Sequence, residues 1–301
     1  MKRAVRFFAT VAFAVPLSFH AAAQEGTLKK IKDAGSITIG HRDGSVPFSY
    51  YDDKQQPVGY AMDLCARIVA AVKSELKAPK LDVKYQLVTS ANRIPLMANG
   101  TIDLECGSTT NNLERQKQVA FTITHFVTAN RWVAKKSAKI HSLQDLKGKT
   151  IVSTAGTTNI KQITEINGQQ NLGMNIISAN GHPEAFQMVE TGRAVAFVMD
   201  DILLYGLAAQ SRNPKDYAIS AEALSVEPYG IMLRRDDPAF KKVVDNAMIQ
   251  TYKSGAINAI YDKWFQKPVP PRNINLNVPM SEQLKKVIRN PTDSGDPKDY
   301  Q

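Results

Sequence analysis

The chain has 301 residues and a formal net charge of +10 at pH 7, from 38 Lys and Arg against 28 Asp and Glu. The basic residues are scattered, without a run of five or more and without a basic stripe interleaved with aromatic residues. This pattern argues against a nucleic-acid-binding protein and indicates a solvated basic surface that attracts small anions.

The first residues predict a secretory signal peptide over 1–23. Three basic residues lie within the first six positions, Phe7–Phe19 is mostly apolar, and Ala21–Ala23 provides a small-residue cleavage pattern. The apolar part is too short for a transmembrane helix. We therefore expect an exported protein.

From Leu28 onward, expected helices and strands alternate. Strands are expected at Ser36–Arg42, Leu81–Thr89 and 101–106, and helices at Leu28–Ala34, Gly59–Leu76 and 92–100. The segment Gly59–Leu76 has apolar residues at helical spacing, whereas Leu81–Thr89 alternates between apolar and polar residues. This order predicts an α/β lobe with a parallel sheet.

A second series of the same kind follows. Its expected strands are Trp132–Ser137, 150–154, 174–180 and 193–201, with helices beginning near 142, 157 and 182. A late strand begins at Tyr229, and a long helical region broken near Gly255 is expected to return to the first lobe. After Pro268, we expect a tail with one short helix at Ser281–Arg289 and a frayed polar end.

Hydroxyl side chains collect where two strands lead into helices. Ser108, Thr109 and Thr110 precede a helix that carries Arg115, and Thr157 and Thr158 follow the strand 150–154. Backbone N–H groups at a helix start bind anions, and a guanidinium pairs well with a carboxylate. The alternative, ordinary N-capping by a single Ser or Thr, stays open for each hydroxyl.

Other charged residues follow the ends of expected strands. Arg42 ends the first strand, and Arg93 follows the second strand close to Ser90. Asp200 ends an apolar strand and either holds an ammonium group or caps the next helix. His182 is either a loop residue or a ligand contact. Because ligands of open α/β sheets bind at the carboxyl ends of strands, these groups would share one cleft. A ligand with two carboxylates and one ammonium group would satisfy them.

The two cysteines are Cys65 and Cys106. Export permits a disulfide between them, but two buried free thiols fit the sequence equally well. Their spacing does not match a zinc site or a CxxC motif.

Five segments of the sequence are similar to those of a known family: HRDGSVPFSYYD, TSANRIPL, NGTIDLECGSTTNNLERQKQVAF, TAGTT and GRAVAFVMDD. They resemble the periplasmic glutamate/aspartate-binding proteins of ABC amino-acid importers, and the resemblance covers about Leu28 to Asn275. It implies the α/β fold of type II periplasmic binding proteins, in which two lobes joined by two hinge crossings enclose a ligand cleft. It also implies a periplasmic monomer without catalytic residues, metal or cofactor, which delivers L-glutamate or L-aspartate to permease subunits.

The resemblance further implies lobe boundaries and residue roles. The first lobe would comprise 24–128 plus 226–275, the second lobe 129–225, and the tail 276–301. The implied roles are α-carboxylate binding by Arg115, Ser108, Thr110 and Thr157 or Thr158, ammonium binding by Asp200, and side-chain carboxylate binding by Arg42, Arg93, Ser90 and His182. The alternative function is an exported dehydratase-like enzyme on the same fold, acting on a carboxylate substrate.

Overall fold

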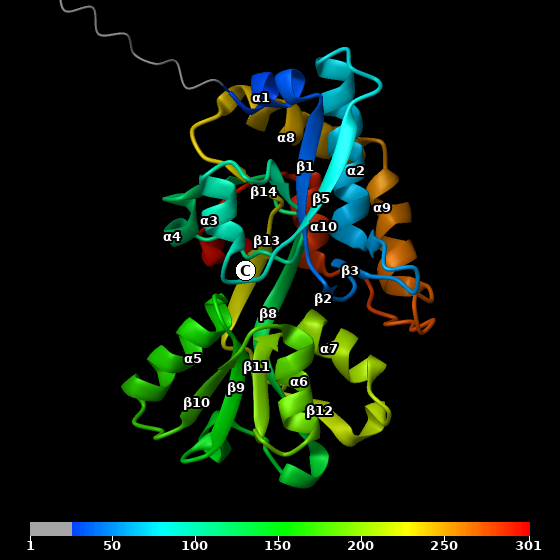
Figure 1. Ribbon diagram of the computed structural model, residues 1–301. Coiled ribbons are helices and arrows are strands. Elements are labelled where there is room, and N and C mark those ends of the chain that lie inside the picture. The colour runs from blue at the N-terminus through cyan, green and yellow to red at the C-terminus, as the bar shows by residue number, and fades with distance from the viewer. Residues whose placement is uncertain (1–25) are drawn as a thin grey trace, which may run out of the picture.

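The computed structural model describes residues 26–301, so the predicted signal peptide over 1–23 lies outside the described residues. Figure 1 shows two lobes, each built from a β-sheet with helices packed on it. Within residues 26–301, no helix is both long and apolar enough to cross a lipid bilayer.

The first lobe, the upper one in Figure 1, contains a five-stranded sheet of order β5–β1–β6–β14–β7. The strands are β1 Ser36–His41, β5 Asp82–Leu87, β6 Leu104–Glu105, β7 Val119–Phe121 and β14 Met232–Arg234. Strand β1 is parallel to β5 and β6, but β14 is antiparallel to β6 and β7. The three strands from which a parallel sheet was predicted, β1, β5 and β6, are therefore parallel as expected, whereas β14 returns late in the chain and enters the sheet in the opposite direction.

Helices and a small sheet complete the first lobe. The helices are α1 Thr27–Ala34, α2 Tyr60–Glu75, α3 Arg93–Ala98, α4 Leu113–Gln116, α8 Pro238–Lys253 and α9 Ala256–Tyr261. The small sheet contains β2 Gly44–Ser45, β3 Ser49–Tyr51 and β4 Pro57–Val58. Along α2, the predicted apolar spacing places Leu64, Ile68 and Val72 in the core, each with 0% of its surface exposed.

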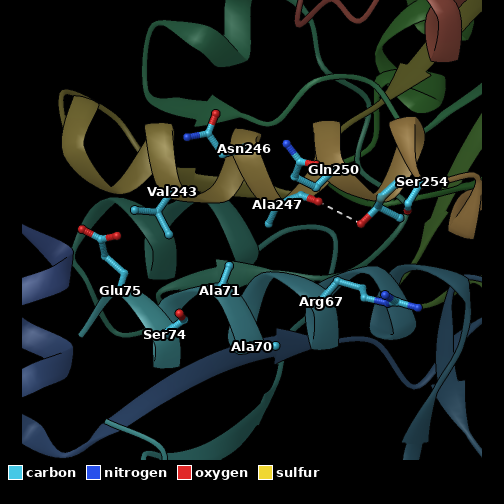
Figure 2. Close-up of a pocket in the computed structure, with 11 residues that line it drawn as sticks. Arg67, Ala70, Ala71, Ser74, Glu75, Val243, Asn246, Ala247, Gln250 and Ser254 are labelled. Carbon is cyan, nitrogen blue, oxygen red and sulfur yellow. Dashed lines mark hydrogen bonds between the residues drawn. The ribbon is translucent and has the colours of Figure 1, made fainter. Parts of the chain in front are cut away.

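Helix α8 packs against α2, so the late part of the chain returns to the first lobe as expected. Figure 2 shows the groove between these two helices, which has a volume of about 490 Å³. Small side chains, among them Ala70, Ala71 and Ala247, line it. The groove belongs to the packing of the first lobe and contains none of the predicted site residues.

The second lobe contains a sheet of order β10–β9–β11–β8–β12, with β13 also paired to β8. Its strands are β8 Phe126–Lys135, β9 Thr150–Thr154, β10 Asn175–Ala179, β11 Ala196–Asp200, β12 Tyr217–Ile219 and β13 Ser225–Tyr229. Its helices are α5 Thr158–Gln169, α6 His182–Glu190 and α7 Asp201–Gln210. Strand β8 begins six residues earlier than the expected strand at Trp132, and β13 was not expected as a strand.

Strands β8 and β13 connect the two lobes, as Figure 1 shows. They are antiparallel, with Tyr229 opposite Phe126 and Ser225 opposite Asn130. Beyond Asn130, β8 pairs with β11 inside the second lobe. Paired backbone hydrogen bonds therefore join the two crossings into one ribbon.

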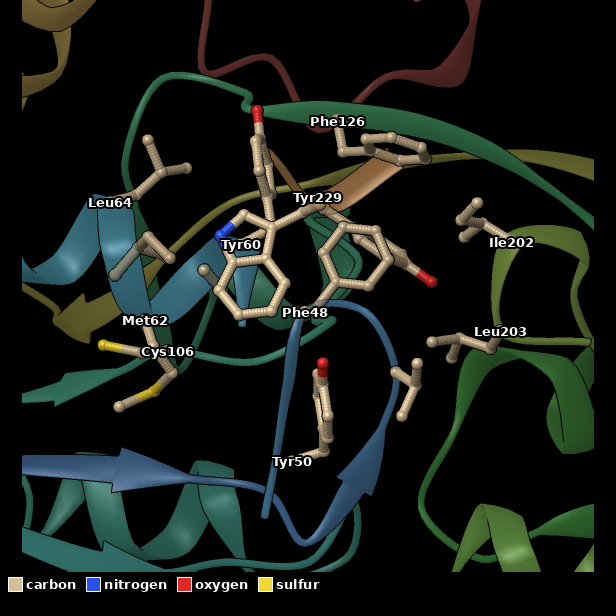
Figure 3. Close-up of a cluster of buried hydrophobic side chains, with 14 of the residues drawn as sticks. Phe48, Tyr50, Tyr60, Met62, Leu64, Cys106, Phe126, Ile202, Leu203 and Tyr229 are labelled. Carbon is tan, nitrogen blue, oxygen red and sulfur yellow. The ribbon is translucent and has the colours of Figure 1, made fainter. Parts of the chain in front are cut away.

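An apolar core extends across this junction (Figure 3). The ring of Phe48 lies 5.0 Å from that of Phe126 and 5.2 Å from that of Tyr229, edge to face in both pairs. Ile202 and Leu203 of α7 belong to the same buried cluster. Because residues of both lobes share this core, the crossing strands are anchored in apolar packing at the junction.

The C-terminal tail is packed against the protein, so the expectation of a frayed end is wrong. Helix α10 Glu282–Arg289 buries Leu284 and Val287, and a 3₁₀ turn at Pro297–Tyr300 buries the Tyr300 ring. Helix α10 is where it was expected. The packing of the last residues depends on single side chains, which leave no periodic pattern in a sequence.

Cys65 and Cys106 form a disulfide, and their Cα atoms are 6.3 Å apart. This finding decides between the two alternatives that the sequence left open. The bond ties α2 to the residue that directly follows β6. It therefore anchors the start of the loop that carries Ser108 and Thr110.

Candidate functional site

Three buried arginines from three separate segments of the first lobe converge. Arg42 follows β1, Arg93 begins α3 and Arg115 lies on α4, and their exposed fractions are 1%, 2% and 7%. Arg93 donates a hydrogen bond of 2.5 Å to Thr109, which donates one of 2.5 Å to the buried carboxylate of Glu105. Arg115 donates to the carbonyl of Thr110 at 2.8 Å.

The charges of these arginines are incompletely compensated. Burial and then the charge of Arg93 lower the pKa of Arg42 to about 10 and that of Arg115 to about 9. Burial also lowers the pKa of Arg93. Glu105 is the nearby acidic partner, yet its Oε1 lies 3.9 Å from Arg93 Nη1. Because buried cations disfavour one another, an anion placed among them is favoured.

Several donors in this region have no partner within residues 26–301. They are Nε and Nη1 of Arg42, Nε of Arg93, and the hydroxyls of Ser90 and Ser108. Buried polar groups are nearly always hydrogen-bonded, since an unpaired buried donor is costly. These donors are therefore available to the oxygens of a bound anion.

The second lobe meets this cluster through the turn between β9 and α5. Arg115 Nη2 donates to the carbonyl of Gly156 at 3.3 Å, across the two lobes. Gly156 has φ of +76°, and a Cβ there would lie 2.5 Å from the Cα of Ala91 in the first lobe. Glycine is thus required at position 156 for two reasons: its positive φ and the close approach of the two lobes.

The two threonines after this turn already have partners. The Thr157 hydroxyl donates to the carbonyl of Thr154 at 2.7 Å and caps α5 by accepting from the N–H of Ile160 at 3.3 Å. The Thr158 hydroxyl donates to Glu227 at 2.9 Å. Capping, the alternative left open by the sequence, is therefore what the Thr157 side chain does here.

His182 is buried at the start of α6, with 2% of its surface exposed. Its Nδ1 lies 2.8 Å from the hydroxyl of Thr154. Burial, followed by the charges of Arg42 and Arg93, lowers the pKa of His182 well below its ordinary value. The imidazole is therefore neutral at pH 7, and it can offer a hydrogen bond without adding a fourth positive charge.

Asp200 ends β11 with a fully buried carboxylate. It accepts hydrogen bonds from Asn159 at 2.7 Å and from the hydroxyl of Tyr229, and it makes no side-chain cap for α7. Burial, and then the charge of Glu227, raises the pKa of Asp200 to about 7. A cation next to this carboxylate would offset that penalty.

The structure thus brings together residues from six segments predicted to contribute to one site. The first-lobe members are Arg42, Ser90, Arg93, Ser108, Thr110 and Arg115, and the second-lobe members are Thr157, Thr158, His182 and Asp200. The helix expected after the hydroxyl cluster has only four residues, so its macrodipole is small. Side-chain and backbone donors, rather than a helix end, therefore supply the positive character there.

The prediction of site residues missed the groups that hold Asp200. Tyr229 lies on β13 and Asn159 on α5, and Glu227 accepts from Thr158 and, at 2.8 Å, from Gln162. Their sequence context is that of ordinary core and helix residues. Only their pairing across elements gives them a place in the site.

The sequence matches the bacterial extracellular solute-binding proteins, family 3, over residues 37–267. An L-glutamate/L-aspartate-binding protein of Pseudomonas aeruginosa is 53% identical over 296 residues, covering 97% of this chain and 98% of that protein. The glutamate/aspartate import solute-binding protein of Escherichia coli is 48% identical over 273 residues, covering 91% and 90% respectively.

Among solved structures, a cysteine-binding protein from Campylobacter jejuni aligns with a TM-score of 0.71 and 25% identity, covering 84% of this chain and 96% of that chain. The likeness confirms the predicted two-lobe α/β fold of type II periplasmic binding proteins. With a family match over most of its length and relatives of about half identical sequence, the chain belongs to the bacterial extracellular solute-binding proteins, family 3.

Proposed function

We propose that this protein captures L-glutamate or L-aspartate in the cleft between its lobes and delivers it to the permease of an ABC importer. The observation that carries this proposal is the cluster of three buried arginines, with unpaired donors, facing a buried aspartate. Two ligand carboxylates and one ammonium group would complete this set. The names of the relatives in P. aeruginosa and E. coli support the same ligands.

In the proposed complex, the α-carboxylate lies between Arg115, Ser108 and Thr110, and the turn of Thr157 and Thr158 closes on it. Asp200 takes the ammonium group. The side-chain carboxylate lies among four groups of the opposite end: Arg42, Arg93, Ser90 and His182. A guanidinium fork satisfies a carboxylate with two parallel hydrogen bonds, which suits the three arginines to this task.

Ligand capture would close the cleft. We propose that residues 24–128 and 226–275 move as one body against 129–225, with the hinges where β8 and β13 pass between the lobes. A ligand that contacts both lobes binds the closed state more tightly, so it shifts the population towards closure.

The relatives are named as solute-binding proteins, which indicates a binding protein rather than a dehydratase-like enzyme. The groups that could act as acid or base already hold structural partners: Glu105 with Thr109, Asp200 with Tyr229, and His182 with Thr154. We further propose that residues 1–23 direct the chain to the periplasm, where it acts as a monomer and meets permease subunits in the inner membrane.

Calorimetric titration of the mature protein with glutamate, aspartate, glutamine and asparagine tests the proposal. We expect glutamate or aspartate to bind at least ~100-fold more tightly than the amides, because an amide leaves buried guanidinium charge unpaired. No product should form. Equal affinities for acid and amide would contradict the dicarboxylate assignment.

Replacing Arg93 tests its proposed contact with the side-chain carboxylate. Arg93→Ala should weaken binding by ~2–5 kcal/mol, whereas Arg67→Ala, on the far groove of Figure 2, should leave it unchanged. An unaltered dissociation constant for Arg93→Ala would exclude this residue from the binding site.

A further inference from the structure

The last residues of the chain contact the segment 111–116, which includes α4 and bears Arg115. We propose that the segment 291–301 is a positioning element that fixes segment 111–116, and through it the guanidinium of Arg115, for ligand binding. This inference rests on the proposed function of the cleft. It assigns a role to a tail that lies beyond the family match, which ends at residue 267.

The first contact joins the tail to Asn111, just before α4, and to Gln116, the last residue of α4. The side-chain amide of Asn111 donates to the carbonyls of Asp293 at 2.8 Å and Ser294 at 3.3 Å. Gln116 donates to the same Asp293 carbonyl at 3.0 Å and to the Asn111 Oδ1 at 2.8 Å. Two residues that flank Arg115 along the chain are thus held by one turn of the tail.

The second contact is steric and lies against the first turn of α4. A Cβ on Gly295 would lie 2.8 Å from the carbonyl carbon of Asn112 and 2.8 Å from the nitrogen of Leu113. Both are backbone atoms, which cannot rotate away as a side chain does. Asn112 also caps α4 by accepting from the N–H of Arg115 at 2.8 Å. The tail therefore touches the residue that fixes the backbone of Arg115.

The tail is in turn fixed to the body of the protein. Tyr300 is 2% exposed, its hydroxyl donates to the Ser294 carbonyl at 2.7 Å, and it lies 2.8 Å from the Thr124 hydroxyl. The N–H of Thr124 donates to the carbonyl of Thr292 at 2.8 Å. The Asp293 carboxylate lies 2.8 Å from the ammonium of Lys241 on α8. The turn against α4 is thus anchored on both sides.

These contacts form a short chain from the tail to the ligand site. The N–H of Asn111 donates to the carbonyl of Pro228 on β13, and Thr110 before it holds Arg115 Nη1 through its carbonyl. Displacing Asn111 or Asn112 would therefore move Arg115 relative to Gly156 and Ser108. A positioning role predicts weaker binding without loss of the folded state.

The test uses the full mature chain with Gly295→Ala, which forces the tail away from α4. Calorimetry should show the dissociation constants for glutamate and aspartate rising by the same factor, about tenfold, because Arg115 serves the α-carboxylate that both ligands share. The matched control is Gly168→Ala on α5, where an added Cβ meets nothing within 4 Å. Its dissociation constants should stay within about twofold of the parent protein.

Circular dichroism and thermal melting of each unliganded variant separate positioning from stability. A folded Gly295→Ala protein with parental affinity, whatever its melting temperature, would overturn the inference. If Gly295→Ala does not fold, Tyr300→Phe decides, since it removes only the hydroxyl shared with Thr124 and Ser294. About threefold weaker binding of both ligands supports the role, and unchanged binding overturns it.

The parent titration keeps the two proposals apart. If the parent protein binds glutamate or aspartate and the tail variants bind equally well, the tail inference fails alone. If the parent protein binds neither ligand, the proposed function fails and the tail inference falls with it.

Discussion

Buried charges of both signs meet between the two lobes without fully cancelling. The carboxylate of Asp200 accepts hydrogen bonds from Asn159 and Tyr229, and burial raises its pKa to about 7. The positive charges of the three arginines are also incompletely balanced, since burial and repulsion by Arg93 lower the pKa of Arg42 and Arg115. A zwitterionic dicarboxylate would relieve both conditions at once, so ligand affinity should depend on protonation of the site.

Glutamate affinity should fall as pH decreases from 8 to 5. Below about pH 7 the free protein holds a proton on Asp200, and an ammonium ligand requires the carboxylate, so binding must release that proton. Calorimetry at pH 6 in two buffers of different ionisation enthalpy should detect the release, which Asp200→Asn should abolish. Identical heats in both buffers would contradict this assignment.

The raised pKa of Asp200 makes the unliganded protein more stable, not less, as pH falls. Because the folded pKa of Asp200 lies above its unfolded value of 3.8, its contribution to stability is complete below that value and is lost as pH rises through 7. Asp200 thus makes the empty protein less stable at pH 8 than at pH 5. Ligand ammonium would remove this penalty.

Part of the candidate site could be predicted from the sequence. Arg42, Arg93 and Arg115 follow strand ends in recognisable segments, and Asp200 and His182 border the second-lobe elements. Glu227 and Tyr229 could not be found this way, because their roles depend on partners in other elements. The Thr157 hydroxyl shows the converse, since its capping bond is local and was one of the two alternatives.

At the scale of elements, turns of the two lobes approach each other closely at two places. Gly44 on β2 faces Pro183 of α6, and an added Cβ would lie 2.5 Å from the ring Cγ. Gly156 has the same relation to the backbone of Ala91. The two lobes therefore meet through positions that tolerate no side chain.

Gly44→Ala should weaken glutamate binding about tenfold, because the added methyl group meets a rigid proline ring and holds the lobes apart. Gly181→Ala is the matched control, since its Cβ would contact the same ring at an ordinary 3.8 Å. Calorimetry measures both. Wild-type affinity in Gly44→Ala would show that these turns need not meet in the complex.

Most elements were predictable because their side-chain spacing is periodic, as in α2 and β5. The direction of β14 and the extent of β13 were not. Three residues of β14 are too few to show a direction, and β13 contains Pro228, which weakens a strand prediction. The docking of Tyr300 depends on Thr124, which is distant in sequence.

At the scale of the whole molecule, the two lobes share the β8–β13 ribbon and the apolar junction. A ligand that joins them should stabilise the complete protein against unfolding rather than one half of it. The Cys65–Cys106 disulfide and the packing of α8 on α2 strengthen the first lobe independently of the ligand.

Glutamate at 100 times its dissociation constant should raise the melting temperature by roughly 5–10 °C. That concentration adds ~2.7 kcal/mol to the free energy of unfolding, and each kcal/mol corresponds to ~2–4 °C at this size. Differential scanning calorimetry should show one shifted transition. Two transitions, with one unmoved by ligand, would indicate lobes that unfold independently.

The position of β14 also constrains the order in which the two sheets can be completed. Every strand of the second sheet lies within 126–229, so that sheet can be completed by contiguous sequence. In the sheet of the first lobe, β14 (residues 232–234) lies between β6 and β7. Strands β6 and β7 come before residues 126–229 in the chain, whereas β14 comes after them. During synthesis, the sheet of the first lobe therefore stays incomplete until β14 has been made. The hydrophobic surfaces of that lobe are exposed to chaperones and proteases throughout this delay.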